Sequence, residues 1–168
     1  MGRLPGEFGN RKITFRVPFN MPGELVLDGG QLGLQFPEAT FLHNQDKPFE
    51  IHRLIPRVTA LDVNNLYYVT LQPSLDALFS CTRLRIFDVS KNENLTKNAQ
   101  LLSTLCKGTN ERSWEFAEPY TLVRSEGLQI TVDNLGTAAI FGGVYSKSRI
   151  EITFQGFLIQ IAPPTADR

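Results

Sequence analysis

Polar side chains that could do chemistry are densest in the run DVSKNENLTKN, residues 88–98. From Asp88 onward, every second position carries an oxygen-bearing side chain, in the order Asp, Ser, Asn, Asn, which is the spacing of a calcium-binding loop. Such a loop needs glycine at its sixth position and a bidentate acid at its twelfth, where this chain has Glu93 and Ala99. The run therefore does not favour a calcium site, and we interpret it as an exposed polar turn.

The same run carries two further signatures. Residues 90–93 have the Ser-x-x-Glu form of a capping box, and apolar residues then recur at steps of three or four, which predicts a helix near residues 95–107. Lys107 followed by Gly108 is a helix-stop signature. Residues 94–96 form an N-glycosylation sequon, which we interpret as a chance match because the chain shows no export signal.

The two histidines, His43 and His52, are the strongest candidates for metal ligands, with Asp46 and Glu50 close to them in sequence. If a metal were bound, these two imidazoles would be its first ligands. A cupin-type site needs a His-x-His pair, which this chain lacks. We therefore expect structural histidines, no metal and no cofactor.

Candidates for catalysis exist, but no catalytic pattern surrounds them. Cys81 or Cys106 with His52 would make a thiol–imidazole pair, and Glu115 with Glu118 a carboxylate pair for glycoside chemistry. No nucleophile elbow, cysteine-centred signature or glycine-rich phosphate loop accompanies them. We expect a chain that is not an enzyme, and two cysteines that are free, buried thiols.

The composition restricts the partners that we expect. There are 17 basic and 17 acidic residues, so the formal net charge is zero, which argues against nucleic acid as a partner. The longest apolar stretch is far shorter than the roughly 18 residues of a membrane-spanning helix. The N-terminus lacks the apolar segment of a secretory signal. We expect no membrane, no nucleic acid and no small-molecule substrate.

The elements that must position these residues are mostly extended. The run RIEITF, residues 149–154, alternates apolar and polar residues, so Ile150, Ile152 and Phe154 are predicted to face a core. Gly156, just after this run, predicts a bulge or tight bend in the strand. Pro56, between two extended runs, marks a kink or an edge position. The fold class is mainly β, a β-sandwich with Greek-key or jelly-roll wiring and one helix. The predicted strands are residues 13–17, 24–28, 39–43, 49–55, 57–63, 66–71, 83–89, 121–124, 128–133, 149–154 and 157–161.

Proline and glycine crowd the first 37 residues, leaving room there only for the short extended pieces at 13–17 and 24–28. We predict that residues 1–37 form an N-terminal arm that lies over a sandwich domain of residues 38–168. The alternative is that residues 1–37 are a loop-rich edge of the same domain.

Three runs together, RLRIFDVSKNENLTKN, ERSWEFAEPYTLVRSEGLQITVDN and EITFQGFLIQIAPP, resemble capsid decoration (cement) proteins of tailed bacteriophages with a jelly-roll-like sandwich. The resemblance implies a non-enzymatic virion structural protein that binds the major capsid protein and stabilises the assembled shell from its outer surface. It also implies a homo-oligomer, a dimer or trimer, made in the host cytoplasm without a signal peptide. We expect the arm and the loops around 88–98 and 134–148 to make the contacts.

Two other functions stay open at this point. One is a carbohydrate- or receptor-binding β-sandwich module, in which Trp114 or Tyr120 would be an exposed platform for sugar stacking rather than a core or interface anchor. The other is a head–tail connector or tail component. The candidate interaction residues are Arg3, Arg11, Lys12, Arg83, Arg85, Asn92, Asn94, Trp114 and Tyr120.

Overall fold

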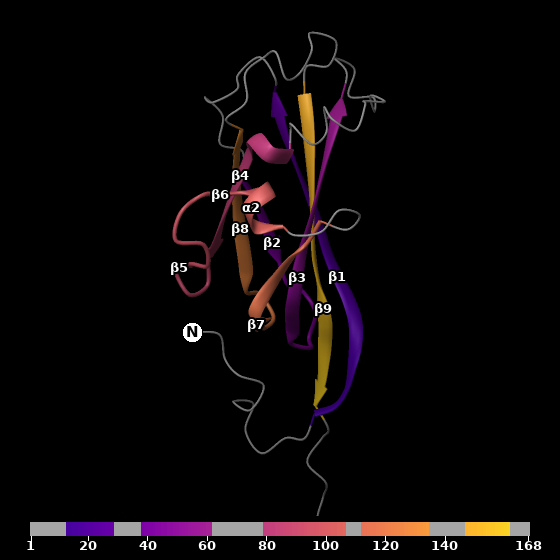
Figure 1. The fold of residues 1–168 in the computed structure, drawn as a ribbon. Coiled ribbons are helices and arrows are strands. Elements are labelled where there is room, and N and C mark those ends of the chain that lie inside the picture. The colour runs from indigo at the N-terminus through magenta and orange to yellow at the C-terminus, as the bar shows by residue number, and fades with distance from the viewer. Residues whose placement is uncertain (1–12, 29–37, 62–78, 107–111, 135–146, 162–168) are drawn as a thin grey trace, which may run out of the picture.

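Two antiparallel sheets packed face to face form the protein. The computed structural model describes residues 13–28, 38–61, 79–106, 112–134 and 147–161. One sheet has the strand order β1-β9-β3-β7, and the other has the order β2-β8-β4-β5, with β6 also pairing with β4 (Figure 1). The elements are β1 (Ile13–Asp28), β2 (Glu38–Leu42), β3 (Phe49–Leu61), β4 (Thr82–Asp88), β5 (Glu93–Asn94), β6 (Gln100–Leu101), α2 (Leu102–Leu105), β7 (Trp114–Leu122), β8 (Gly127–Asn134) and β9 (Lys147–Ile161).

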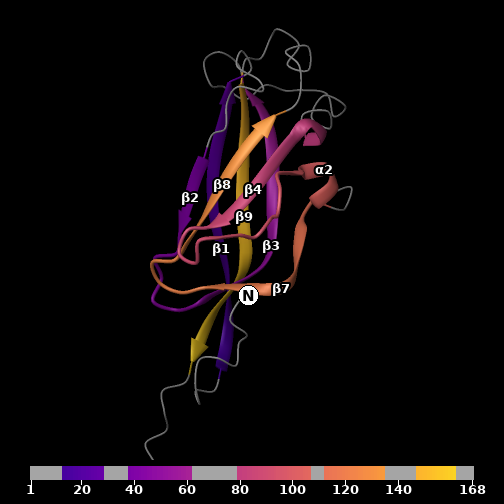
Figure 2. The ribbon, with the colours of Figure 1, turned by 90° about the vertical axis from the view of Figure 1, so that its left-hand side faces the viewer.

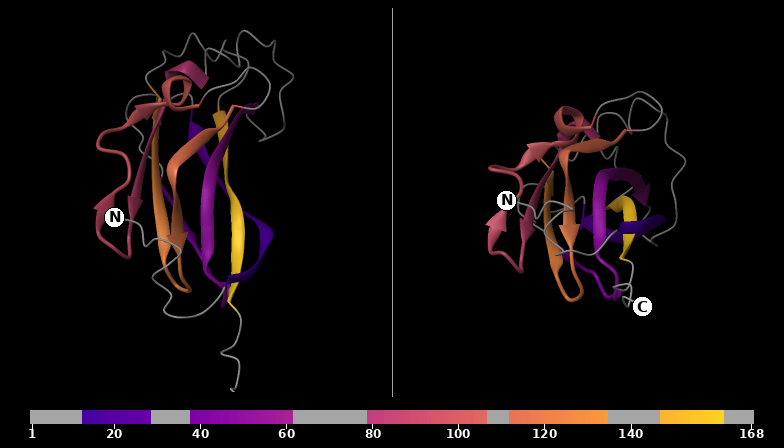
Figure 3. Two further views of the ribbon diagram at one scale, coloured as in Figure 1. Left: turned by 60° about the horizontal axis from the view of Figure 1, so that its bottom comes forward. Right: turned by 90° about the horizontal axis from the view of Figure 1, so that it is seen from below.

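The core lies between the sheets because apolar residues alternate with polar ones along most strands. Ile150, Ile152 and Phe154 of β9 are fully buried, as their alternation in the sequence predicts. Phe41 of β2 meets Phe154 across the sandwich, edge to face, with ring centroids 5.3 Å apart. Figure 2 looks onto the β2-β8-β4 sheet with the other sheet behind it, and Figure 3 shows the two layers from below. The predicted mainly β class is confirmed, while the Greek-key or jelly-roll wiring stays a prediction.

The N-terminal segment differs from its prediction as an arm with two short strands. Residues 13–28 form one continuous strand, β1, which pairs with β9 along its length, and Met21 and Leu25 are buried in the core. β1 is an outermost strand of its sheet, where Pro18 and Pro22 are tolerated because a proline at an edge costs no ladder hydrogen bond. Pro18 and Pro22, which suggested that the strand would be interrupted, instead lie within an edge strand of the sandwich. Residues 1–12 and 29–37 lie outside the described residues.

The helix predicted near residues 95–107 is wrong apart from one turn, α2. The chain from Glu93 to Leu101 instead runs back along β4, where Leu95 donates its backbone N–H to the carbonyl of Ile86 at 3.0 Å. The buried hydroxyl of Thr96 accepts from the Ile86 N–H at 3.1 Å. These bonds to the sheet replace the bonds that a helix would make, so the apolar residues reach the core from an edge segment. Gly108, the predicted helix stop, lies outside the described residues.

The bulge predicted at Gly156 occurs in the strand that pairs with it. β9 is continuous from Lys147 to Ile161, whereas β3 shifts register between Ile51 and Arg53, directly opposite Gly156. Among the described strands Pro56 occupies an edge position, as predicted, because the pairing of β3 with β7 ends at Leu54 and β9 alone of them continues beside it. The other described strands overlap their predicted positions, but the strand predicted at 121–124 is wrong in extent, because β7 spans Trp114–Leu122 and shares only two residues with it. Residues 62–63 and 66–71 lie outside the described ones.

Candidate interaction surface

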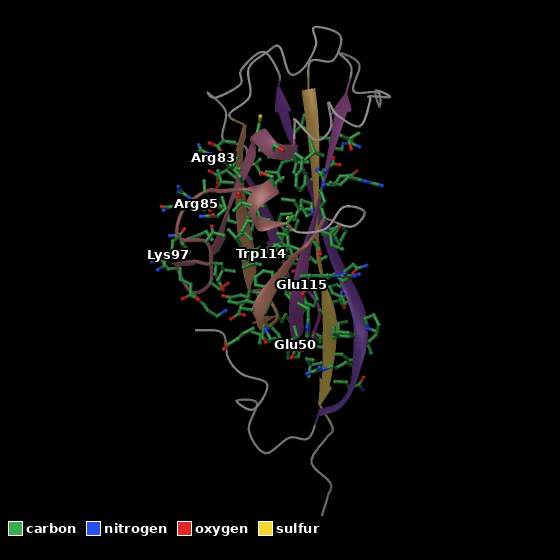
Figure 4. The ribbon with its side chains drawn as sticks, in the orientation of Figure 1. Glu50, Arg83, Arg85, Lys97, Trp114 and Glu115 are labelled. Carbon is green, nitrogen blue, oxygen red and sulfur yellow. The ribbon has the colours of Figure 1, made fainter. Side chains whose placement is uncertain are left out.

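The outer face of the β2-β8-β4 sheet carries the charged residues that the sequence singled out. Arg83 lies directly opposite Asp133 in the register of β4 and β8, and Arg85 lies opposite Thr131. Paired residues point to the same face of a sheet, so the two arginines stand side by side along β4. Figure 4 shows Arg83, Arg85 and Lys97 projecting from this side of the molecule.

Arg83 and Asp133 form a two-point ion pair. The Nε of Arg83 donates to Oδ1 of Asp133 at 3.0 Å, and its second nitrogen donates to Oδ2. Hydrogen bonding to Asp133 raises the pKa of the Arg83 guanidinium. The ion pair holds the Arg83 side chain against β8, and Asp133 balances the charge of the guanidinium within the protein.

Arg85 stands differently, with its guanidinium exposed to solvent. No carboxylate within the described part of the chain engages it. In the same row across the sheet, Glu38 of β2 and Arg85 flank the short side chain of Thr131. Glu38 is held by a hydrogen bond from the Gln129 amide. The result is a polar hollow of about 590 Å³, which we call the charged hollow. Its polar wall comes from Glu38, Arg83, Arg85, Asn98, Thr131 and Asp133.

The turn after β4 is organised around the carboxylate of Asp88, which is completely buried. Its Oδ1 accepts from the backbone N–H groups of Ser90 and Lys91 at 2.8 and 2.9 Å. Its Oδ2 accepts from Lys91 Nζ at 2.9 Å and from the Tyr120 hydroxyl. Because Asp88 belongs to one sheet and Tyr120 to the other, this contact ties the sheets together. We call this group of Asp88, Lys91 and Tyr120 the seam cluster.

The seam cluster changes the titration of both buried groups. Burial alone would raise the pKa of Asp88, but hydrogen bonds from Lys91 and Tyr120 outweigh it and lower the pKa. Burial and the neighbouring Asp88 carboxylate raise the pKa of Tyr120 above its ordinary value of 10.0. The phenol therefore stays a proton donor, and the Asp88 oxygens are engaged by groups of the protein itself. The capping box predicted at residues 90–93 is wrong, since Ser90 instead accepts from the Gly127 N–H at 3.1 Å.

Of the remaining candidate interaction residues, Asn92 and Asn94 are exposed, as an interface requires, whereas Tyr120 is buried. Asn92 and Asn94 are exposed on the turn, and Asn92 adopts a left-handed conformation with φ of 54°. Tyr120 is 6% exposed, so it cannot be a platform for sugar stacking. Trp114 is half-buried and stacks on Phe116 with ring centroids 4.5 Å apart. Arg3, Arg11 and Lys12 lie outside the described residues.

The two histidines point into different surroundings. His43 is buried between the sheets against Phe49, and its Nε2 lies 2.7 Å from the carbonyl of Lys47. His52 lies on the outer face of the β1-β9-β3-β7 sheet and contacts Phe157. The two imidazoles therefore have no contact residue in common. Among the described residues, no three His, Cys, Asp or Glu side chains cluster as metal ligands would.

Among the described residues, His52 contacts Glu50 and Phe157 and neither of the cysteines with which it was considered for catalysis. Cys81 and Cys106 are free, as predicted, although Cys81 is only half-buried. Burial raises the pKa of Cys106 to about 12, against a lowering by Arg112. Glu115 and Glu118 are both exposed on β7. No helix in the described ranges is long and apolar enough to span a membrane.

No protein-family model, no curated protein and no solved structure matches the chain.

Proposed function

We propose that the protein is a virion structural protein, a capsid decoration or cement protein that binds and stabilises the assembled major capsid shell. The charged hollow is the observation on which this proposal rests. There, Arg83 is neutralised by Asp133, while the exposed Arg85 has no carboxylate partner among the residues that the structure describes. An exposed arginine on a rigid strand is well suited to bind a carboxylate of a neighbouring subunit. The role is non-enzymatic, and the protein acts as a homo-oligomer on the outer surface of the shell.

Two other features support the same role. The sequence resembles decoration proteins over its strand-forming runs. The exposed turn that carries Asn92 and Asn94 is pinned at its base by the seam cluster, so it offers polar groups in a fixed position. Many weak contacts of this kind, repeated over a symmetric shell, give strong total binding because each bound copy adds to the others' effective concentration.

Cosedimentation with capsid shells tests the charged hollow directly. Purified protein is mixed with shells of the phage that encodes it, stripped of this protein, and the bound fraction is measured. We expect Arg85→Glu to reduce the affinity at least about tenfold, the effect of losing one charged hydrogen bond and adding a repulsion. Arg57→Glu is the matched control, because Arg57 is an exposed arginine on a strand of the other sheet. Equal binding of the two variants would contradict the assignment of this face.

Imaging of virions distinguishes the proposal from a head–tail connector or tail component. A cement protein covers the shell in on the order of hundreds of symmetry-related copies. A few copies in a ring at one vertex would contradict the proposal and favour a connector. Deleting residues 2–12 separately tests whether the N-terminal residues contribute to the binding.

A further inference from the structure

The outer face of the β2-β8-β4 sheet continues beyond the charged hollow into an apolar row. Leu42 lies opposite Gly127 in the register of β2 and β8. The pairing of β8 with β4 runs one residue past β4, where Val89 donates its backbone N–H to the Gly127 carbonyl at 3.1 Å. Phe41 and Asp88, the residues next in the chain, are buried, so Leu42 and Val89 both point outward. We call Leu42, Gly127 and Val89 the apolar row.

The apolar row leaves two large apolar side chains in solvent. Leu42 is 53% exposed and Val89 is 49% exposed, whereas the other exposed large apolar side chains of the described residues, Val17 and Val26, belong to β1. Leu42 leans over Gly127, since a Cβ atom on the glycine would lie 2.8 Å from the end of the leucine side chain. Adjoining apolar surface of this kind marks an interaction site when a charged rim accompanies it.

The charged hollow supplies such a rim on the same face. In β8, Thr131 lies four residues from Gly127 and points to the same side of the sheet. Its neighbours across the sheet are Glu38 on β2 and Arg85 on β4. At the rise of an extended strand, this charged row and the apolar row are about 13 Å apart. One continuous face therefore presents apolar surface at one end and charge at the other.

Positive charges outnumber negative ones around the hollow. Arg83 is balanced by Asp133, whereas Arg85 is exposed and has no carboxylate partner among the described residues. Lys97, which is exposed on the same side of the molecule (Figure 4), is a further cation. Glu38 is separated from Arg85 by β8, a distance of about 10 Å between their backbones at the usual strand spacing. This end of the face is therefore complementary to a partner's carboxylate.

We propose that the apolar row and Arg85 together bind an extended peptide segment in which an apolar and an acidic side chain lie four residues apart. Given the proposed function, on which this inference rests, the segment belongs to the major capsid protein. Side chains four residues apart on an extended segment point the same way and lie about 13 Å apart, which matches the separation of the two rows. The apolar side chain packs on Leu42 and Val89, and the carboxylate accepts a charge-assisted hydrogen bond from Arg85.

Short peptides test this inference without capsid shells. The probe is acetyl-Thr-Leu-Thr-Thr-Thr-Glu-Thr-amide, together with the same peptide in reversed order, because the face determines the spacing and not the chain direction. The control peptide, acetyl-Thr-Leu-Thr-Thr-Glu-Thr-Thr-amide, has the same composition but puts leucine and glutamate on opposite sides of an extended chain. In NMR titrations of the full chain, the better probe should bind about tenfold more tightly than the control, the effect of one charged hydrogen bond.

Variants of the full chain assign the two ends of the segment. Arg85→Ala should weaken binding of the probe about tenfold, because the carboxylate loses its partner. Val89→Thr, which keeps the shape of the side chain, should weaken it about fourfold, the effect of one methyl group removed from apolar contact. Val26→Thr is the matched control, because Val26 is 40% exposed on the other sheet, and it should leave binding unchanged. Thermal unfolding checks that each variant is folded.

Three results would overturn the inference: equal binding of the probes and the control peptide, equal losses in Val26→Thr and Val89→Thr, or a native dimer in sedimentation that Val89→Asp dissociates. The last would assign the apolar row to a second copy of the chain. Shells that bind the native chain but not Arg85→Glu, without any preference among the peptides, would leave the proposed function intact. Selective peptide binding without binding to shells would overturn the proposed function instead.

Discussion

The two outer faces of the sandwich hold charge in opposite ways. On the β2-β8-β4 face, Arg83 and Asp133 are direct partners in a regular register, and their contact lies near solvent. On the β1-β9-β3 face, Glu50 is withdrawn from solvent and held by Arg16 of β1 and His52 of β3, two strands that flank β9, beside the register shift in β3. The regular register places Arg83 toward solvent and Asp133 beneath it at 6% exposure, whereas the Glu50 carboxylate, at 1% exposure, lies beside a shift in register. The predictions below test this difference, beginning with the largest expected effect.

Gly156→Ala should be the most destabilising change. The added methyl would collide with the backbone of Glu50, which cannot move without breaking the pairing of β3 with β9. We expect a loss of at least about 3 kcal/mol in the free energy of unfolding, measured in urea. Gly127→Ala is the control from the other face: its closest contact, at 2.8 Å, is the end of the Leu42 side chain, so it should cost much less. Equal losses would show that the bulge is not under special constraint.

Tyr120→Phe should remove the hydroxyl that joins the two sheets at Asp88. The expected loss is about 2 kcal/mol at neutral pH, because the buried carboxylate loses one of its donors. Urea unfolding measures it, and because phenylalanine keeps the aromatic ring, the loss reports the hydroxyl alone. A loss below about 0.5 kcal/mol, the range of ordinary surface substitutions, would mean that the seam cluster contributes little.

The seam cluster should also make stability depend on pH in the acid range. The pKa of Asp88 is lower in the folded protein than its ordinary value of 3.8, so the unfolded chain binds the proton first as the pH falls. The stabilisation is therefore complete above about pH 4 and is lost as the pH falls through the folded pKa. Asp88→Asn should flatten this part of the curve in urea unfolding measured between about pH 5 and pH 2. An unchanged slope in the variant would contradict the assignment.

Arg83→Ala should have the smallest effect. The side chain of Arg83 is 34% exposed although that of Asp133 is only 8% exposed, so water screens the pair from the arginine side and the loss should be about 1 kcal/mol. Glu50→Gln, the corresponding change on the other face, should cost more, because Arg16 and His52 lose the charge around which they are arranged. Urea unfolding of both variants at low and high salt checks the comparison, and only Arg83→Ala should approach the native value at high salt. The reverse order would remove the distinction between the two faces.

Local sequence predicted the strands well because alternation acts within a few residues. The burial of Ile150, Ile152 and Phe154 and the irregularity near Gly156 follow from period and residue type. The same local reasoning failed for residues 95–107, where a spacing of three and four residues suited both a helix and an edge segment. It failed for residues 13–28 as well: Pro18 and Pro22 would interrupt a central strand, but they are tolerated in β1 because β1 lies at an edge.

The candidate site residues were likewise predictable only where the local sequence decides their exposure. Arg83 and Arg85 were identified from the sequence because alternation puts both on one exposed face, and Asn92 and Asn94 because polar turns are exposed. The roles of Glu50 and His52 were missed, since their partners Arg16 and Phe157 lie more than thirty residues away along the chain. Composition and period thus determined the class of fold and the exposed charges of this protein. Tertiary pairing alone decided which distant strands meet, and therefore which carboxylates are buried and where the surface is hollowed.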